Sequence, residues 1–191
     1  MNWYFVRHGE IESNRKKVYA GWNDEGLTAT GWRQAKDAAE QLLNYNIEAI
    51  YCSPLRRTVQ TAKIIADLLN QMIIVDEHFK ELKLGIWEGM SEEEIVRRFP
   101  SELHQWNVRP ADFLLEGRET LGQLLKRVLR GMAEIASVNS KKSILVVTHV
   151  AIIRVLLLYF QNMHLNLYRT IPIPNGEIFP FEGIGLQQLE V

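Results

Sequence analysis

Short apolar runs that alternate with longer helical patterns constrain the fold of this chain more than any other feature. The runs are the segments 3–6, 47–52, 72–75 and 144–148. Helical patterns cover the segments 28–45, 53–69, 121–136 and 150–159. Strands that alternate with helices in this way are typical of a mostly parallel sheet with helices on both faces. We therefore predict an α/β fold, a three-layer α/β/α sandwich, with an edge hairpin formed by the segments 178–181 and 186–191.

One stretch, 89–117, departs from this alternation. Ser91 and Glu94 form a capping-box pattern, which predicts a short helix that ends before Pro100. The rest of the stretch carries aromatic residues but no strand pattern. We predict a small lid insertion over a site, within one domain that spans residues 1–191.

Composition limits the class of protein. With 191 residues, 47% of them hydrophobic, the chain has enough apolar material for one globular core. A net charge of -1 provides no basic field for nucleic acid, so no nucleic-acid partner is expected. The most apolar run, 150–160, carries Arg154 and is too short to cross a bilayer, so no membrane partner is expected either.

Cysteine and histidine usage bounds the chemistry. The single cysteine, Cys52, follows an apolar run and is predicted to be a buried thiol. One cysteine and no signal-peptide pattern lead us to expect a cytoplasmic protein. The five histidines show no pair at metal-ligand spacing, so we expect no metal and no other cofactor.

Three of the predicted strands end in residues that suit a phosphate. His8 follows the first strand, Ser53 to Arg57 follow the second, and His149 follows the fourth. Ligands of such sheets bind at the carboxyl ends of the strands, so we expect these side chains on one rim. Ser53 as N-cap and Pro54 at the first helical position predict a helix start whose free N–H groups favour an anion beside Arg57.

The tetrapeptide Arg7-His8-Gly9-Glu10 strengthens this prediction. The Arg7 guanidinium offers donors to phosphoryl oxygens and favours a neutral, nucleophilic imidazole at His8. Gly9 would let the backbone approach a ligand closely. Glu10 is acidic beside an anion site, so we assign it a structural or pKa-setting role.

Separated blocks in this chain, in the same order, resemble the histidine phosphatase superfamily, also called the phosphoglycerate mutase-like family. The blocks are Arg7-His8-Gly9-Glu10 with Asn14, Ala20-Gly21-Trp22 with Leu27-Thr28, Ser53 to Ala62, Glu81 to Gly89, and Val146 to His149. They span nearly the whole chain, and their coincidence makes the match specific.

The resemblance implies a metal-independent phosphomonoesterase. His8 would attack phosphorus to form a phosphohistidine intermediate. The phosphate-binding set that it implies is Arg7, Asn14, Gly21, Arg57, His149 and Val150, with His149 as an imidazolium. Glu81 would donate a proton to the leaving alkoxide, which requires a raised pKa.

Other residues have simpler interpretations. Val150 and Arg118 stand where the family usually has glycine. Val150 would narrow the pocket, and Arg118 is either a substrate selector or, as we favour, a surface charge of the lid. Structural or surface roles are expected for Arg56, His78, His104 and His164. The lid residues Trp106, Phe113, Leu114 and Leu115 are either the core of the lid or an apolar wall for the substrate.

The short chain and modest lid favour a phosphatase that acts on a small phosphorylated metabolite. Candidate activities are hydrolysis of α-ribazole 5′-phosphate, hydrolysis of phosphoserine, and broad-specificity hydrolysis. A phosphoglycerate mutase and a non-catalytic phosphate-binding scaffold are the alternatives. The sequence leaves a homodimer open.

Overall fold

The computed structural model describes residues 1–138 and 143–189, and its centre is a five-stranded sheet in the order β3-β2-β4-β1-β5. The strands are β1 (Asn2–Arg7), β2 (Ala49–Cys52), β3 (Ile73–Val75), β4 (Ser143–Thr148) and β5 (Ile178–Phe181). The pairs β1–β4, β2–β4 and β2–β3 are parallel, and β5 runs antiparallel to β1 at one edge. The predicted α/β fold with a mostly parallel sheet is confirmed.

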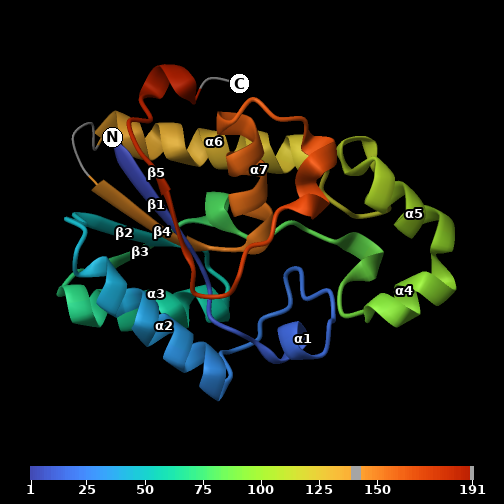
Figure 1. The fold of residues 1–191 in the computed structure, drawn as a ribbon, viewed down its shortest axis with the longest axis horizontal. Helices are drawn as coiled ribbons and strands as arrows, with labels where there is room; N and C mark the ends of the chain where they lie inside the picture. The colour runs from blue at the N-terminus through green and yellow to red at the C-terminus, as the bar shows by residue number, and fades with distance from the viewer. Residues whose placement is uncertain (139–142, 190–191) are drawn as a thin grey trace.

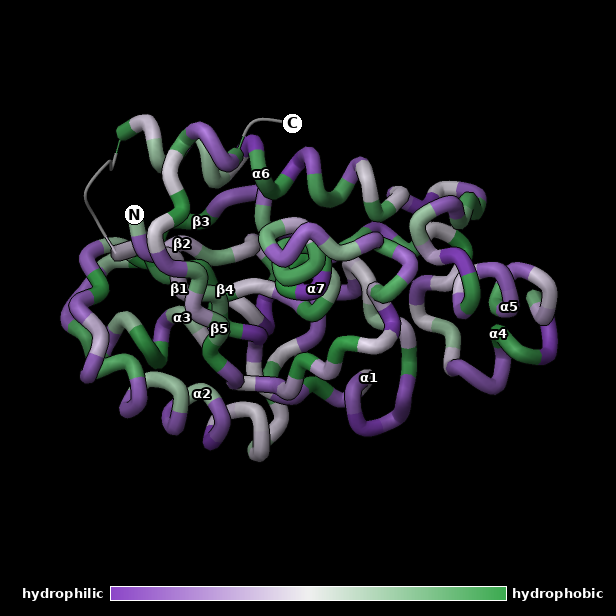
Figure 2. The backbone as a smooth tube through the Cα atoms, turned by 45° about the horizontal axis from the view of Figure 1, so that its top comes forward, coloured by the Kyte–Doolittle hydropathy of each residue, from purple (hydrophilic) through white to green (hydrophobic). Residues whose placement is uncertain are grey.

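Helices cover both faces of the sheet (Figure 1). One face carries α2 (Ala29–Leu42) and α3 (Arg56–Leu69), and the other carries α6 (Leu121–Val138) and α7 (Val150–Phe160). Alternate strand residues divide between the two cores because successive side chains point to opposite faces. In β1, Trp3 and Phe5 pack with α6 and α7, whereas Tyr4 and Val6 pack with α2 and α3. Figure 2 shows how hydropathy follows this packing: α2 is hydrophilic on its outer side and hydrophobic on the side that faces the sheet, while α7 is mostly hydrophobic.

The remaining helices are short, and the last of them follows β5 beside the start of β1. They are α1 (Glu12–Arg15), α4 (Glu92–Arg98), α5 (Pro100–Val108), and the 3₁₀ helices η1 (Glu77–Phe79), η2 (Gly85–Trp87), η3 (Pro110–Asp112), η4 (Leu165–Thr170) and η5 (Leu186–Gln188). The capping box of α4 is present, because the N–H of Glu94 donates to Ser91 Oγ and the N–H of Ser91 donates to the Glu94 carboxylate. The segment 89–117 holds α4, α5 and η3, and α4 and α5 project from one end of the molecule (Figure 1). That it acts as a lid stays a prediction.

Two local predictions are wrong. The segment predicted as the second hairpin strand forms η5, and Leu189 beside it is buried in the core; residues 190 and 191 lie outside the described part. Helix α3 begins at Arg56, with Leu55 at the N-cap position, and the Asp24 carboxylate from a distant loop accepts the N–H of Arg56 at 2.6 Å. The helix start that we expected to favour an anion is therefore capped by a carboxylate.

Within residues 1–138 and 143–189, no helix combines the length and apolar content needed to cross a membrane. Cys52 is fully buried, as predicted, and burial raises the pKa of its thiol to about 12. The homodimer and the cytoplasmic location stay predictions.

Candidate active site

A cavity of about 500 Å³ opens at the carboxyl ends of the central strands. Strand β4 lies between β1 and β2, so the residues that follow these three strands share one rim. The predicted site residues that line the cavity are Arg7, His8, Asn14, Gly21, Arg57, Glu81 and Val150. His149 is fully buried beside them, with its ring centroid 5.3 Å from that of His8. The fold thus brings the whole predicted set together.

The His8 ring is held in one orientation. Its Nδ1 lies 2.7 Å from the carbonyl oxygen of Gly9, which assigns the proton to Nδ1 and leaves a lone pair on Nε2. Burial, followed by the charges of Arg57 and Arg7, lowers the pKa of His8 well below its usual 6.5. The side chain is therefore a neutral imidazole with a free nucleophilic nitrogen.

Gly9 is required by packing within the fold. A Cβ at this position would lie 2.3 Å from the carbonyl oxygen of Gly31 in α2. The glycine permits close approach between the His8 turn and the start of α2. That it also lets the backbone approach a ligand stays a prediction. Glu10 is structural as predicted, since its carboxylate accepts the hydroxyl proton of Thr28 at 2.7 Å.

The two arginines of the site are fixed by backbone carbonyls. Arg57 is 1% exposed and donates to the carbonyl oxygens of Asn23 and Gly21, both at 2.7 Å. Arg7 donates to the carbonyl oxygen of Ile173. Neither guanidinium has a carboxylate partner in the described parts of the chain, and each keeps a buried Nε without an acceptor. Burial lowers the pKa of Arg7 to about 10, and both groups remain cations able to bind an anion.

Ser53, which the sequence suggested only as a helix cap, belongs to the site. Its Oγ lies 2.7 Å from Nε2 of His149 and accepts the N–H of Leu55. The hydroxyl proton is therefore free to donate to Nε2, which places the imidazole proton on Nδ1. Nδ1 has no partner in the described structure. The signal in the sequence was the position of Ser53 at a strand end, shared with His8 and His149.

The predicted imidazolium at His149 is not supported. Burial, followed by the charges of Arg57, His8 and Arg7, lowers the pKa of His149 well below 6.5. A neutral ring with its proton on Nδ1 is still a hydrogen-bond donor. The positive charge of the site comes from the arginines.

Removal of the Ser53 hydroxyl tests this tautomer assignment. We expect Ser53→Ala to lower kcat/KM for a phosphomonoester roughly 10-fold, because one lost buried hydrogen bond is worth about 1–2 kcal/mol. Steady-state kinetics measures the effect, and Ser101→Ala, on the exposed surface of α5, is the control. An unchanged kcat/KM in Ser53→Ala would remove Ser53 from the site.

Glu81 is a buried carboxyl at the edge of the same cavity. It is 7% exposed, and its Oε1 accepts the N–H of Leu82 at 2.8 Å. Burial raises the pKa of Glu81 above 4.5, against the opposing charges of Arg57 and Arg7. A carboxyl with a raised pKa beside two cations is suited to proton donation near neutral pH.

Asn14 is held by a residue that the sequence did not reveal. Its amide oxygen accepts the N–H of Ile11 at 3.2 Å and the side-chain N–H of Asn175 at 3.1 Å. Asn175 also donates to the carbonyl oxygen of His8 at 2.9 Å. The amide nitrogen of Asn14 is thus the group left to donate to a ligand. No sequence signal marked Asn175, because it precedes an edge strand far from the other blocks.

Arg118 is not the surface charge that we favoured. Its guanidinium lies 4.0 Å from the centroid of the Trp106 ring and 5.2 Å from that of Phe113. Both terminal nitrogens are buried without an acceptor, and burial lowers the pKa of Arg118 to about 10. Phe113 is buried and Leu114 exposed, so of the aromatic and apolar lid residues only Trp106 lines the cavity.

The fold and site define a class of enzyme, and comparison with known proteins identifies it. The family model of the histidine phosphatase superfamily (branch 1) matches residues 3–184, so the chain belongs to this superfamily. Phosphoserine phosphatase 1 of Hydrogenobacter thermophilus is 33% identical over 144 residues, which are 75% of this chain and 68% of that protein. The chain is a phosphatase of this superfamily.

Solved structures agree with the family. The YhfR structure of Bacillus stearothermophilus has a TM-score of 0.91 at 26% identity and covers 96% of this chain and 92% of its own. A phosphoserine phosphatase of Entamoeba histolytica, solved in complex with phosphoserine, has a TM-score of 0.83 at 27% identity, with coverage of 94% and 89%.

Proposed function

We propose that this protein is a metal-independent phosphomonoesterase that hydrolyses a small phosphorylated metabolite through a phosphohistidine. The observation that carries the proposal is the neutral His8, with Nε2 free, beside two arginines that have no carboxylate partner among the described residues. In the first step Nε2 forms a bond to phosphorus while the bond from phosphorus to the ester oxygen breaks. In the second step water attacks phosphorus, the bond from Nε2 to phosphorus breaks, and inorganic phosphate forms.

In both steps, side chains that are already oriented would stabilise the negative charge on the phosphoryl oxygens. Arg7 and Arg57 would donate to the equatorial oxygens of the transferring phosphoryl group, with Nδ1–H of His149 and the amide of Asn14 beside them. Their positions are fixed by backbone carbonyls and by Ser53, so little reorganisation accompanies the reaction. The arginines can supply the positive charge that a metal supplies in other phosphatases.

Glu81 would act as the general acid in the first step and as the general base in the second. It gives its proton to the leaving alkoxide in the first step and takes one from the attacking water in the second, so the enzyme returns to its starting state. A phosphate-binding scaffold would have no use for a buried carboxyl here, because burial of such a group costs free energy. The position of Glu81 therefore supports catalysis over the scaffold alternative.

The charges of the outer cavity favour a substrate with a second anionic group. Beyond the phosphate site the cavity walls carry Lys17, Arg154 and Arg169 against one acid, Glu92. None of these three cations forms an ion pair within the described residues. A carboxylate next to the phosphomonoester would satisfy this surplus of positive charge. Phosphoserine has that chemistry, whereas the base of α-ribazole 5′-phosphate offers no anion.

A matched pair of substrates tests this substrate class. Phosphoserine and O-phosphoethanolamine differ only in the carboxylate, and we expect kcat/KM at least roughly 10-fold higher for phosphoserine, which corresponds to about 1.4 kcal/mol. Arg169→Gln should remove most of that preference, since Arg169 is exposed and its guanidinium donates to the Tyr19 hydroxyl and not to a carboxylate. The exposed Arg33→Gln is the control. Equal kcat/KM values for the two compounds would contradict the proposal that the outer cavity binds a substrate carboxylate.

The activity itself is tested with p-nitrophenyl phosphate and excess EDTA. We expect the same rate of phosphate release with and without the chelator. Loss of activity on chelation would contradict the metal-independent mechanism. Release of an isomeric phosphate ester in place of inorganic phosphate, with 3-phosphoglycerate as substrate, would favour the mutase.

A further inference from the structure

The segment that carries Glu81 has no regular secondary structure, and side chains hold its backbone. It leaves η1 at Phe79 and enters η2 at Gly85, and no strand or long helix satisfies the carbonyl groups between. Buried carbonyls need partners, so something else must fix the path of this segment. Thr148 at the end of β4 donates its hydroxyl proton to the carbonyl oxygen of Phe79 at 2.8 Å. The carbonyls of His78, Lys80 and Glu81 turn toward α6 instead.

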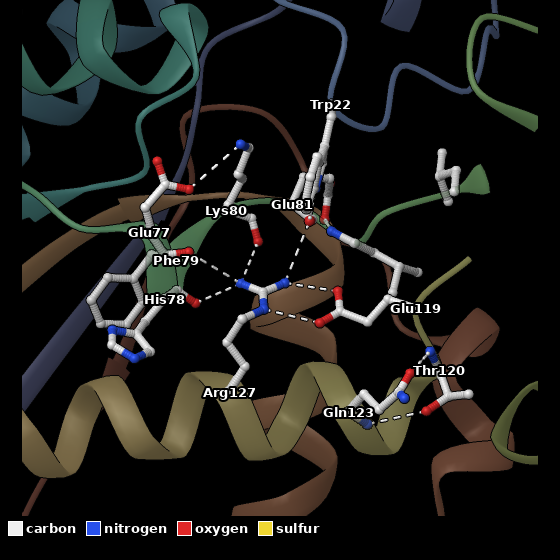
Figure 3. A network of polar contacts seen from close by, with 12 residues as sticks. Trp22, Glu77, His78, Phe79, Lys80, Glu81, Glu119, Thr120, Gln123 and Arg127 are labelled. Carbon is white, nitrogen blue, oxygen red and sulfur yellow. Dashed lines mark hydrogen bonds and ion pairs between the residues drawn. The ribbon is translucent and has the colours of Figure 1, made fainter. Parts of the chain in front are cut away.

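Arg127 of α6 binds that row of carbonyls (Figure 3). Its Nη1 donates to the carbonyl oxygen of His78 at 2.7 Å and to that of Lys80 at 2.9 Å. Its Nη2 reaches the carbonyl oxygen of Glu81 at 3.5 Å, and the indole N–H of Trp22 donates to the same oxygen at 2.7 Å. The backbone on either side of the Glu81 carboxyl is therefore clamped from two directions.

Glu119 orients Arg127 for this contact. Its carboxylate accepts Nε and Nη2 of Arg127 at 2.9 and 2.8 Å, a bidentate pair that fixes the plane of the guanidinium. The N–H of Glu119 donates to the carbonyl oxygen of Lys83 at 3.0 Å, which holds the far end of the segment. Gly131, one turn further along α6, lets His78 pack so closely that a Cβ there would lie 2.4 Å from the His78 Cβ.

We propose that Arg127, with Glu119 and Trp22, is the positioning device that aims the Glu81 carboxyl at the leaving-group oxygen. The proposal rests on the proposed function, in which Glu81 protonates that oxygen. Arg127 itself lies behind the segment and is not among the residues that line the phosphate cavity. Proton transfer requires hydrogen-bond contact between the carboxyl and the ester oxygen, and a displacement of about 1 Å can cost on the order of 100-fold in rate.

This role predicts a dependence on the leaving group that a purely structural role does not. A strongly basic leaving group needs the proton from Glu81, whereas p-nitrophenolate leaves readily without it. Loss of the contacts that Arg127 and Trp22 make with the Glu81 segment (the clamp) should therefore slow hydrolysis of phenyl phosphate far more than that of p-nitrophenyl phosphate. The two substrates have closely similar shapes. The quantity to compare is kcat/KM, because it reports phosphoryl transfer to His8.

We would measure kcat/KM for a series of aryl phosphates with wild type, Arg127→Gln and Trp22→Phe. For Arg127→Gln we expect roughly 10- to 100-fold loss with phenyl phosphate and about twofold loss with p-nitrophenyl phosphate. Trp22→Phe keeps an aromatic ring but removes the N–H that binds the Glu81 carbonyl, and should show the same pattern, more weakly. Arg130→Gln is the matched control, since Arg130 lies on α6, is 75% exposed, and pairs with Glu134 on the same helix.

The outcomes separate the two proposals. A steeper dependence of log kcat/KM on leaving-group basicity in Arg127→Gln, and an unchanged one in Arg130→Gln, supports the clamp. Parallel loss on every aryl phosphate, in Arg127→Gln and Trp22→Phe alike, overturns it. Should Arg127→Gln fail to fold, Trp22→Phe and Glu119→Gln decide by the same slope. If the wild type hydrolyses no compound of the series, the proposed function fails first.

Discussion

His8→Ala is expected to abolish turnover, with kcat at least about 10⁴-fold below wild type, because no other described residue of the phosphate site presents a free imidazole nitrogen to the phosphoryl group. The described residues that surround the phosphate site offer arginines, a second histidine, an amide, a carboxyl and the Ser53 hydroxyl, which donates to His149. His149 shares its Nε2 with Ser53, so it cannot replace the free nitrogen of His8. Rapid quench with a ³²P-labelled phosphomonoester should trap acid-labile label on wild type and none on His8→Ala.

Binding provides the control for this variant. Arg7 and Arg57 are held by backbone carbonyls, not by His8, so His8→Ala should still bind inorganic phosphate. Loss of a neutral histidine removes no charge from the site and should leave affinity for an anion within about threefold of wild type. Labelled phosphoenzyme on His8→Ala would show that another residue is phosphorylated and would contradict the assignment of His8 as the nucleophile.

The sheet and its main helices could be predicted because their signals are local. Apolar runs of four to six residues and helical periodicity are properties of neighbouring residues, and β1, β4 and α7 appear close to where these patterns predict them. The rim of site residues followed from the same information. Strand order places β4 between β1 and β2, so the residues after these strands had to meet.

The wrong predictions share a cause: contacts between distant parts of the chain. Nothing near Pro54 in the sequence indicates that the Asp24 carboxylate accepts the N–H of Arg56 at the start of α3. In the sequence Arg118 looks like a surface charge of the lid. In the structure it packs against the rings of Trp106 and Phe113, and no sequence pattern indicates this contact. The imidazolium was implied by the family resemblance, while the pKa of His149 depends on burial and on nearby cations.

Arg127 shows the same limit from the functional side. A helical arginine that directly follows Lys126 would ordinarily be assigned to solvent, and only its carbonyl partners in the segment 77–81 reveal its role (Figure 3). The segment needs that partner because its last residues form neither strand nor helix. Residues that position catalytic groups through the backbone are therefore found from hydrogen bonds, not from motifs.

Glu81→Gln is expected to lower kcat/KM for an alkyl phosphate by about 10²- to 10⁴-fold, the usual contribution of a general acid. The amide keeps the size of the side chain and its contact with the N–H of Leu82, but carries no transferable proton. Affinity for inorganic phosphate should remain, and p-nitrophenyl phosphate should suffer much less than the alkyl ester. Equal losses on both substrates would contradict the role of proton donor.

The pH dependence of kcat/KM tests the assignment of Glu81 as the proton donor. Because burial raises the pKa of Glu81 above 4.5, the protonated acid persists to higher pH, and kcat/KM of the wild type falls as pH rises through the raised pKa. The lowered pKa of His8 keeps the nucleophile neutral well below pH 6.5, so His8 does not cause that alkaline fall. Glu81→Gln should lack the alkaline fall while keeping the acidic one, in a pH profile measured with the same alkyl ester.

Stability measured over the same pH range separates chemistry from folding. A carboxyl whose pKa is higher in the folded than in the unfolded state binds its proton more tightly when folded, so its contribution to the free energy of unfolding decreases as pH rises above 4.5. Glu81→Gln removes that decrease. The variant should therefore gain thermal stability relative to wild type as pH rises above 4.5, while it loses activity. A variant that lost both together would have lost its fold, and the kinetic argument for Glu81 would then rest on Glu81→Asp, which keeps the acid but shortens its reach.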